Sequence, residues 1–262
     1  MNGELYRRCV KVFFDLETTG LRRKTSPPDE IVQICASAEG EDFVSYCRPT
    51  VRKNWAGLLP SRSSRPTSFD IHGIGPDRVR EAPTWRELGR EFQRFVRRAS
   101  RDSPAIVLVA YNGWAFDASF MAANNELHGI LGFDRPVYVC DPLRISRLLA
   151  PGVSHKQVDV YARLFRESFA NAHDAAADVR ALRRICEHPS FAPRLAGGCR
   201  RFESLEGPRR PVSAGEAPRR ERPDGSLRAP KAKVHPKSSF SSARSCESCG
   251  VVYSSYFNHE CK

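Results

Sequence analysis

The sequence predicts an α/β domain followed by a basic tail and a short cysteine-containing end. The first observation is a set of apolar runs rich in β-branched and aromatic residues, which favour strands at residues 10–14, 31–38, 42–47, 105–111 and 137–140. The second is a set of segments with helical spacing or helix-start signals, which predict helices over residues 85–96, 116–127, 158–165 and 172–185, and one that starts at Asp141-Pro142. The third is composition: 262 residues with 40% hydrophobic content can build one sizeable core plus extra segments.

Taken in order, the first three strands are expected to form an antiparallel meander, because Glu39-Gly40 suits a tight turn. The polar residues 51–70 are predicted to form a loop, which is either a basic substrate arm or a disordered segment. The run 71–75 contains two glycines around an apolar residue and predicts a shaped turn. Residues 105–111 are continuously apolar, as in a buried parallel strand.

The charge balance favours a polyanionic partner, since 42 basic and 30 acidic residues give a net charge of +12. The chain shows no apolar leader and no apolar run long enough to cross a membrane, so we expect an intracellular protein of the nucleus or cytoplasm. Six scattered cysteines are then expected to be reduced thiols. They are Cys9, Cys35, Cys47, Cys140, Cys186 and Cys199.

Two acids at the end of the first strand indicate a cation site. Asp15 and Glu17 are two residues apart, so an extended backbone points both carboxylates to one face, where a hard divalent cation would relieve their repulsion. By themselves they also fit an edge strand with two solvated acids. Asp117 follows another strand, where it could equally cap a helix, and Asp178 lies in a late helix five residues after His173. If these segments converge, four carboxylates can hold two divalent ions, and His173 can accept a proton near neutral pH.

Three motifs carry a family resemblance. Phe-Asp-Leu-Glu-Thr-Thr-Gly at 14–20, Tyr-Asn-Gly-Trp-Ala-Phe-Asp at 111–117 and His-Asp-Ala-Ala-Ala-Asp at 173–178 resemble the three motifs of the DEDDh (DnaQ-like) 3′–5′ exonucleases. This family includes the bacterial polymerase III proofreading subunit, ribonuclease T and the animal three-prime repair exonucleases. The resemblance covers about residues 8 to 195, and the His-x4-Asp spacing is typical of its histidine subgroup.

The resemblance implies a ribonuclease H-like fold, with a five-stranded mixed sheet flanked by helices, and two Mg²⁺ or Mn²⁺ ions. It implies that Asp15 bridges both ions, that Glu17 and Asp178 complete the shell of the nucleophile-side ion, and that Asp117 holds the other. His173 is the implied general base. Implied contacts to the terminal nucleotide are Thr18, Leu21, Ile71, His72 and Phe116. The polyproline insertion of the three-prime repair enzymes is absent from 129–141, so their dimer and partners are not inferred.

The tail divides the chain into an exonuclease domain at 1–196, a linker at 197–244 and a terminal motif at 245–262. Residues 200–245 hold twelve basic and five acidic residues and six prolines, which predicts a disordered linker that either attracts phosphates or acts as a solvated spacer. The terminal spacing predicts one Zn²⁺ site, whose own ligand is nucleic acid or protein. The expected zinc ligands are Cys246, Cys249, His259 and Cys261.

The sequence thus predicts a metal-dependent 3′–5′ exonuclease that releases nucleoside 5′-monophosphates from single-stranded or frayed DNA. RNA is the alternative substrate, and the sequence does not separate the two. The first rival interpretation is a catalytically weak adaptor that binds nucleic acid or protein. The second is a proofreading subunit held by a polymerase through its tail. The oligomeric state is left open.

Overall fold

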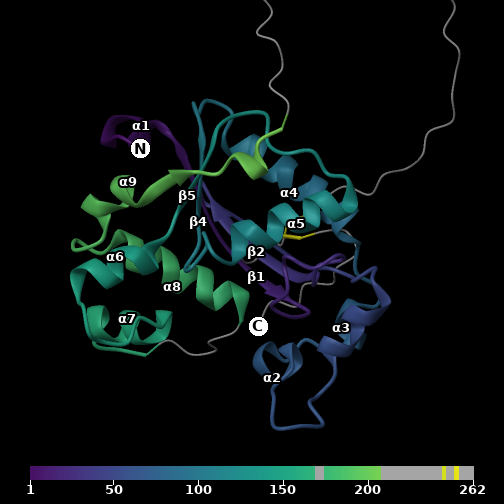
Figure 1. The fold of residues 1–262 in the computed structure, drawn as a ribbon. Coiled ribbons are helices and arrows are strands. Elements are labelled where there is room, and N and C mark those ends of the chain that lie inside the picture. The colour runs from purple at the N-terminus through teal and green to yellow at the C-terminus, as the bar shows by residue number, and fades with distance from the viewer. Residues whose placement is uncertain (169–173, 208–243, 246–250, 254–262) are drawn as a thin grey trace, which may run out of the picture.

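The computed structural model describes residues 1–168, 174–207, 244–245 and 251–253, and its centre is a twisted sheet between helices (Figure 1). His173 and the expected zinc ligands Cys246, Cys249, His259 and Cys261 lie outside the described residues. So does most of the expected linker. The strands are β1 (Val10–Thr18), β2 (Ile31–Ala38), β3 (Glu41–Tyr46), β4 (Ile106–Val109), β5 (Val137–Cys140), β6 (Cys199–Arg201), β7 (Arg244–Ser245) and β8 (Val251–Tyr253).

The sheet is mixed, with strand order β6-β5-β4-β1-β2-β3-β8-β7. β1, β2 and β3 form the predicted antiparallel meander, while β1, β4 and β5 run parallel. β6 then pairs antiparallel with β5. Because β1 lies at the centre between β2 and β4, both of its edges are hydrogen-bonded, and the acids that it carries sit on a rigid element.

The alternating residues of β1 belong to two different layers. Val10, Val12, Phe14 and Leu16 are buried in a core shared with α4 and α5, on one side of the sheet. The other face of the sheet packs against α7 and α8 in a second core, built on Val107 and Val109 of β4. The period of two along β1 therefore turns Asp15 and Glu17 toward the α8 face.

The helices begin and end at recognisable signals. A capping box between Thr84 and Glu87 opens α4, and Asp141 accepts a hydrogen bond from Leu143 N, with Pro142 at the first position of α6. Gly129, with a φ of +62°, ends α5. The α-helices are α1 (Gly3–Arg8), α2 (Ser68–His72), α3 (Pro76–Val79), α4 (Trp85–Ala99), α5 (Asp117–His128), α6 (Pro142–Leu149), α7 (Gln157–Phe165), α8 (Ala175–Glu187) and α9 (Leu195–Gly198). The 3-10 helices are η1 (Arg52–Leu58), η2 (Ala192–Arg194) and η3 (Glu203–Leu205). Within the described part of the chain, no helix is long and apolar enough to cross a membrane.

Two sequence expectations about the end of the domain are wrong. The sheet has more than five strands, because residues 199–201 pair with β5 as β6. The predicted start of the linker at residue 197 is therefore too early, since the fold continues through residue 207. Leu205 is fully buried, and Phe133 N donates a hydrogen bond to its carbonyl at 2.7 Å. The polar and charged composition of this stretch predicted a linker, although it contains the strand β6 and the buried Leu205.

The segment 51–70 is also not the plain loop that its composition predicts. Residues 52–58 form η1, in which Asn54 and Leu58 are buried, and α2 begins at Ser68. The turn expected at 71–75 is present, with Gly73 at a φ of +69° and Ile74 buried. Leu58 packs with Val32 of β2 and with Ile74 in a small core, so the segment lies against β2.

Candidate active site

Three carboxylates from two elements meet on the α8 face of the sheet. Asp15 and Glu17 on β1 and Asp178 on α8 each offer one oxygen, and these three oxygens lie within 4.8 Å of one another. All three side chains are partly buried. The expected convergence of the first and third motifs is therefore present in the fold.

Small residues and two hydrogen bonds place Asp178 against β1. Ala175 and Ala177 are buried and impose no bulk, which lets the first turns of α8 approach the sheet. Asp174 caps the helix by accepting a hydrogen bond from Ala176 N at 3.0 Å. Gln157 of α7 donates a side-chain hydrogen bond to the backbone carbonyl of Asp178 at 2.7 Å. His173, the expected general base, directly precedes the cap residue in sequence and lies outside the described residues.

Asp117 lies next to these acids at the first turn of α5. Its side chain is 2% exposed, and its Oδ1 accepts a hydrogen bond from Leu16 N at 3.1 Å. That amide lies between Asp15 and Glu17 in β1, so this hydrogen bond ties Asp117, the first residue of α5, to β1. Its oxygens are not within the 4.8 Å group formed by the other three carboxylates.

Asp141 supports this side of the site and was not singled out as a functional residue by its sequence pattern. It is 4% exposed, caps α6 and accepts a hydrogen bond from Asn112 N at 2.9 Å. Asn112 has a positive φ of 60° and opens the loop that leads to Asp117. An Asp-Pro pair at a helix start predicts a cap, but nothing in it predicts the distant loop that the carboxylate holds.

The acids destabilise one another in their ionised forms. Burial, followed by the charges of Asp178 and Asp117, raises the pKa of Glu17 from 4.5 to about 8. Burial also raises the pKa of Asp117 to about 7, although its hydrogen bond from Leu16 N opposes the shift. The pKa of Asp15 is likewise raised well above its ordinary value, by burial and by Asp117 and Glu17.

This donor set suits a hard divalent cation. Carboxylate oxygens are the ligands that Mg²⁺ and Mn²⁺ prefer, and a bound cation would remove the repulsion that raises these pKa values. Within the parts of the chain that the structure describes, this is the one group of three or more such side chains close enough to share an ion. The residues present therefore fit the divalent metal that the sequence motifs imply.

The predicted nucleotide contacts differ in exposure. Thr18 is buried, and its carbonyl lies 3.2 Å from Nε2 of His72, so β1 and α2 touch at this point. Leu21 and Ile71 are exposed apolar side chains, 70% and 46% exposed respectively. Phe116 precedes Asp117 and packs on Phe120, with ring centroids 4.7 Å apart.

A mixed α/β sheet that gathers carboxylates on its central strand is suited to hold a divalent cation. Comparison with known proteins gives the family. The model of the Exonuclease family matches residues 12–186, which is well over half of the chain. The chain therefore belongs to this family and is a DEDDh (DnaQ-like) exonuclease.

The similar curated proteins include DNA polymerase III proteins and an exonuclease. The chain is 29% identical over 182 residues to a PolC-type DNA polymerase III of Streptococcus sanguinis, covering 66% of this chain and 11% of that protein. It is 32% identical over 120 residues to the chloroplastic/mitochondrial exonuclease DPD1 of Arabidopsis thaliana, covering 45% and 34%. It is 28% identical to the epsilon subunit of Escherichia coli DNA polymerase III, covering 67% and 69%. The chain spans about a tenth of the PolC-type enzymes.

Solved structures share the fold. Exonuclease I superposes with a TM-score of 0.53 at 20% identity, over 71% of this chain and 42% of that one. A 3′-exonuclease that recognises the histone mRNA stem-loop superposes with a TM-score of 0.51 at 14% identity, over 76% and 93%. At these identities the likeness establishes the exonuclease-like α/β fold.

Proposed function

We propose that the chain is a 3′–5′ exonuclease that removes nucleoside 5′-monophosphates from the 3′ end of single-stranded or frayed DNA. The observation that carries the proposal is the meeting of Asp15, Glu17 and Asp178 within 4.8 Å, beside the buried Asp117. The names of similar proteins support DNA as the substrate, since exonuclease I has been solved with a dT13 oligonucleotide. The 3′-exonuclease of histone mRNA supports RNA as the second candidate.

The proposed chemistry assigns each group a task. Two divalent cations, when bound, would polarise the scissile phosphate and lower the pKa of the attacking water. Asp15, Glu17 and Asp178 would bind them on the α8 face, and Asp117 would complete the set next to Leu16 N. His173, on the basis of its motif spacing, would accept the proton of the attacking water as general base.

The recognition of the 3′ end is proposed to come from apolar contact. Leu21 and Ile71 expose aliphatic surface next to Thr18 and His72, and Phe116 offers an aromatic ring at the start of α5. A site built around one terminal nucleotide needs an unpaired end, which favours single strands. The zinc site at Cys246, Cys249, His259 and Cys261, and a phosphate-attracting linker, remain proposals from sequence alone.

The test uses purified protein with Mg²⁺ or Mn²⁺ and matched 5′-labelled DNA and RNA oligonucleotides. We expect a ladder that shortens from the 3′ end, and the ratio of the DNA and RNA rates identifies the substrate. Asp15→Asn and His173→Ala should abolish turnover while the far-ultraviolet circular dichroism stays unchanged. Normal cleavage by either folded variant would refute the site assignment, and no ladder on any substrate would favour the adaptor interpretation. A polymerase that co-purifies tightly through residues 197–262 would support the proofreading-subunit interpretation.

A further inference from the structure

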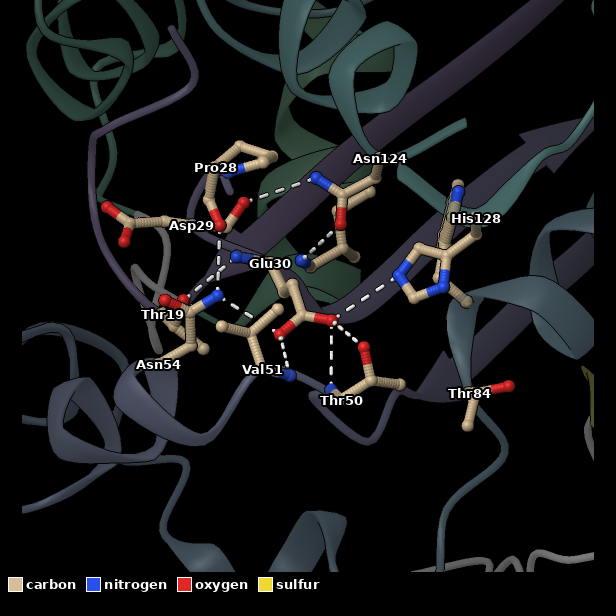
Figure 2. A network of polar contacts seen from close by, with 12 residues as sticks. Thr19, Pro28, Asp29, Glu30, Thr50, Val51, Asn54, Thr84, Asn124 and His128 are labelled. Atoms are coloured by element: carbon tan, nitrogen blue, oxygen red, sulfur yellow. Dashed lines mark hydrogen bonds and ion pairs between the residues drawn. The ribbon is translucent and has the colours of Figure 1, made fainter. Parts of the chain in front are cut away.

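A buried carboxylate at the start of β2 joins several elements around the end of β1 (Figure 2). Glu30 is 1% exposed. Its Oε1 accepts hydrogen bonds from the backbone N and the hydroxyl of Thr50, at 2.9 and 2.8 Å. Its Oε2 accepts from Val51 N at 2.9 Å and from Asn54 Nδ2 at 3.0 Å. Nε2 of His128, at the end of α5, lies 3.3 Å from Oε1. A buried charge is costly without partners, and these contacts together supply the partners of this carboxylate.

The backbone of the same residue holds the turn that follows β1. Thr19 N donates to the carbonyl of Glu30 at 2.8 Å, and Glu30 N donates to the hydroxyl of Thr19 at 2.9 Å. The preceding Asp29 accepts a hydrogen bond from Arg22 N at 2.7 Å. Leu21, which is exposed, therefore lies in a turn whose two sides are tied to residues 29 and 30.

The side chain of Glu30 fixes η1 over this turn, and η1 in turn fixes α2. A Cβ atom at Gly57 of η1 would lie 1.9 Å from the carbonyl oxygen of Thr19, so the two backbones are in direct contact. The hydroxyl of Thr67, the residue before α2, donates to the carbonyl of Leu59 at 2.7 Å, directly after η1. Ile71, the exposed apolar side chain of α2, is thereby connected through η1 to Glu30.

We infer that Glu30 is a positioning residue for the terminal nucleotide, holding Leu21 and Ile71 in one fixed apolar surface. We name this surface the terminal wall, and define it as Leu21 and Ile71 with the elements that carry them, residues 19–22 and α2. The inference rests on the proposed function, because it assigns the wall to the 3′-terminal nucleotide. Glu30 itself is too deeply buried to touch a substrate, so it acts through its neighbours, and its carboxylate reaches η1 through Thr50, Val51 and Asn54.

The metal-binding acids are held by other contacts. Asp15 and Glu17 lie in the regular part of β1, paired with Cys35 and Gln33 of β2, and the register of this pair shifts only after Glu17. Asp178 is held by α8. Loss of the Glu30 contacts should therefore weaken nucleotide binding in the ground state and in the transition state equally, which raises KM and leaves kcat unchanged.

The test measures kcat and KM on a short 3′-ended DNA oligonucleotide, together with Mn²⁺ affinity, for the full chain and three variants. Glu30→Gln keeps the shape but removes the charge, and should raise KM about tenfold with kcat within about twofold. Thr50→Val removes one hydrogen bond with little change in volume, and should raise KM by a few-fold in the same direction. Glu91→Gln is the matched control, because Glu91 is a partly buried carboxylate on α4, away from the wall. It should leave both constants unchanged.

Amide hydrogen exchange supplies a readout that does not need turnover. In Glu30→Gln, exchange should become faster at Thr50 and Val51, whose amides donate to the carboxylate, and in residues 19–22, with no change along residues 10–17. A folded Glu30→Gln with wild-type KM would overturn the inference. So would a parallel loss of kcat and Mn²⁺ affinity, which would show that Glu30 supports the metal site instead.

If the wild type does not shorten the oligonucleotide at all, the proposed function fails, and the wall is then judged on binding. Fluorescence anisotropy with the same labelled oligonucleotide, in Ca²⁺, measures the affinity. A tenfold weaker affinity in Glu30→Gln but not in Glu91→Gln would support the wall, and equal affinities for all three proteins would reject it. The two failures are thus distinguishable.

Discussion

Replacing Glu17 by Gln should stabilise the metal-free protein at neutral pH while it abolishes turnover. Folding raises the pKa of Glu17 from 4.5 to about 8, through burial and the charges of Asp178 and Asp117. The folded state therefore holds a proton that the unfolded state releases, so stability is greatest below pH 4.5 and falls as the pH rises toward 8. At pH 7 a shift of this size costs about 3 kcal/mol, or about 2 kcal/mol when solvent screening of a partly buried group is included. Gln carries no charge and avoids this cost.

The assay is thermal unfolding followed by circular dichroism, in EDTA, at pH 5 and pH 8. A gain of about 2 kcal/mol corresponds to a rise in Tm of about 4–8 °C at pH 8. At pH 5 the rise should be much smaller, because the unfolded carboxyl, with its pKa of 4.5, is then already partly protonated, so that folding takes up only part of a proton at little cost. Mg²⁺ should raise the Tm of the wild type more than that of the variant, since the variant loses a ligand. Glu81→Gln, at an exposed position, is the control and should change nothing. A Glu17→Gln protein that is no more stable than the wild type at pH 8 would refute the reasoning.

Three other perturbations test the fold around the site. A chain that ends at residue 207 should unfold like the full domain, whereas one that ends at residue 196 loses β6 and should have a Tm lower by about 5 °C or more; equal Tm values would contradict the placement of β6. Gly57→Ala should lose about 2 kcal/mol or more in urea unfolding, because its new methyl group would meet the carbonyl of Thr19; wild-type stability would mean that η1 does not touch the turn after β1. Burial alone would raise the pKa of Glu30, but the contacts from His128 and Thr50 outweigh it and lower the pKa to about 2. The stability from this group is therefore present above pH 4.5 and lost as the pH falls toward 2. In Glu30→Gln the free energy of unfolding should therefore fall less steeply between pH 4.5 and pH 2 than in the wild type. Parallel curves for the two proteins would argue against a lowered pKa of Glu30.

The strand and helix pattern was largely predictable, because local periodicity governs it. The runs at 10–14, 31–38 and 105–111 are strands, and the spacing of apolar residues in 85–96 is that of α4. Several short elements were not predicted, η1 and β6 among them. Both of these are stabilised by contacts to residues far along the chain, which no local pattern records.

The family membership was also predictable, because it depends on three motifs with characteristic spacing, and the family comparison confirms it. The same spacing predicts that Asp15 and Glu17 share a face, since a strand has a period of two. The position of Asp178 on the same face depends on the packing of α8 against the sheet, which the motifs do not give. The buried alanines of α8 allow this close packing.

The sequence by itself determined the chemistry available to this protein: the number of carboxylates, their pairing on β1 and the family to which they belong. Only the tertiary structure decided which groups hold that chemistry in place. Glu30 and His128 are 98 positions apart in the printed sequence, and neither belongs to a motif, yet their side chains lie 3.3 Å apart. Such a contact depends on the packing of β2 against α5, and chain folding can satisfy a buried charge with partners from any part of the sequence.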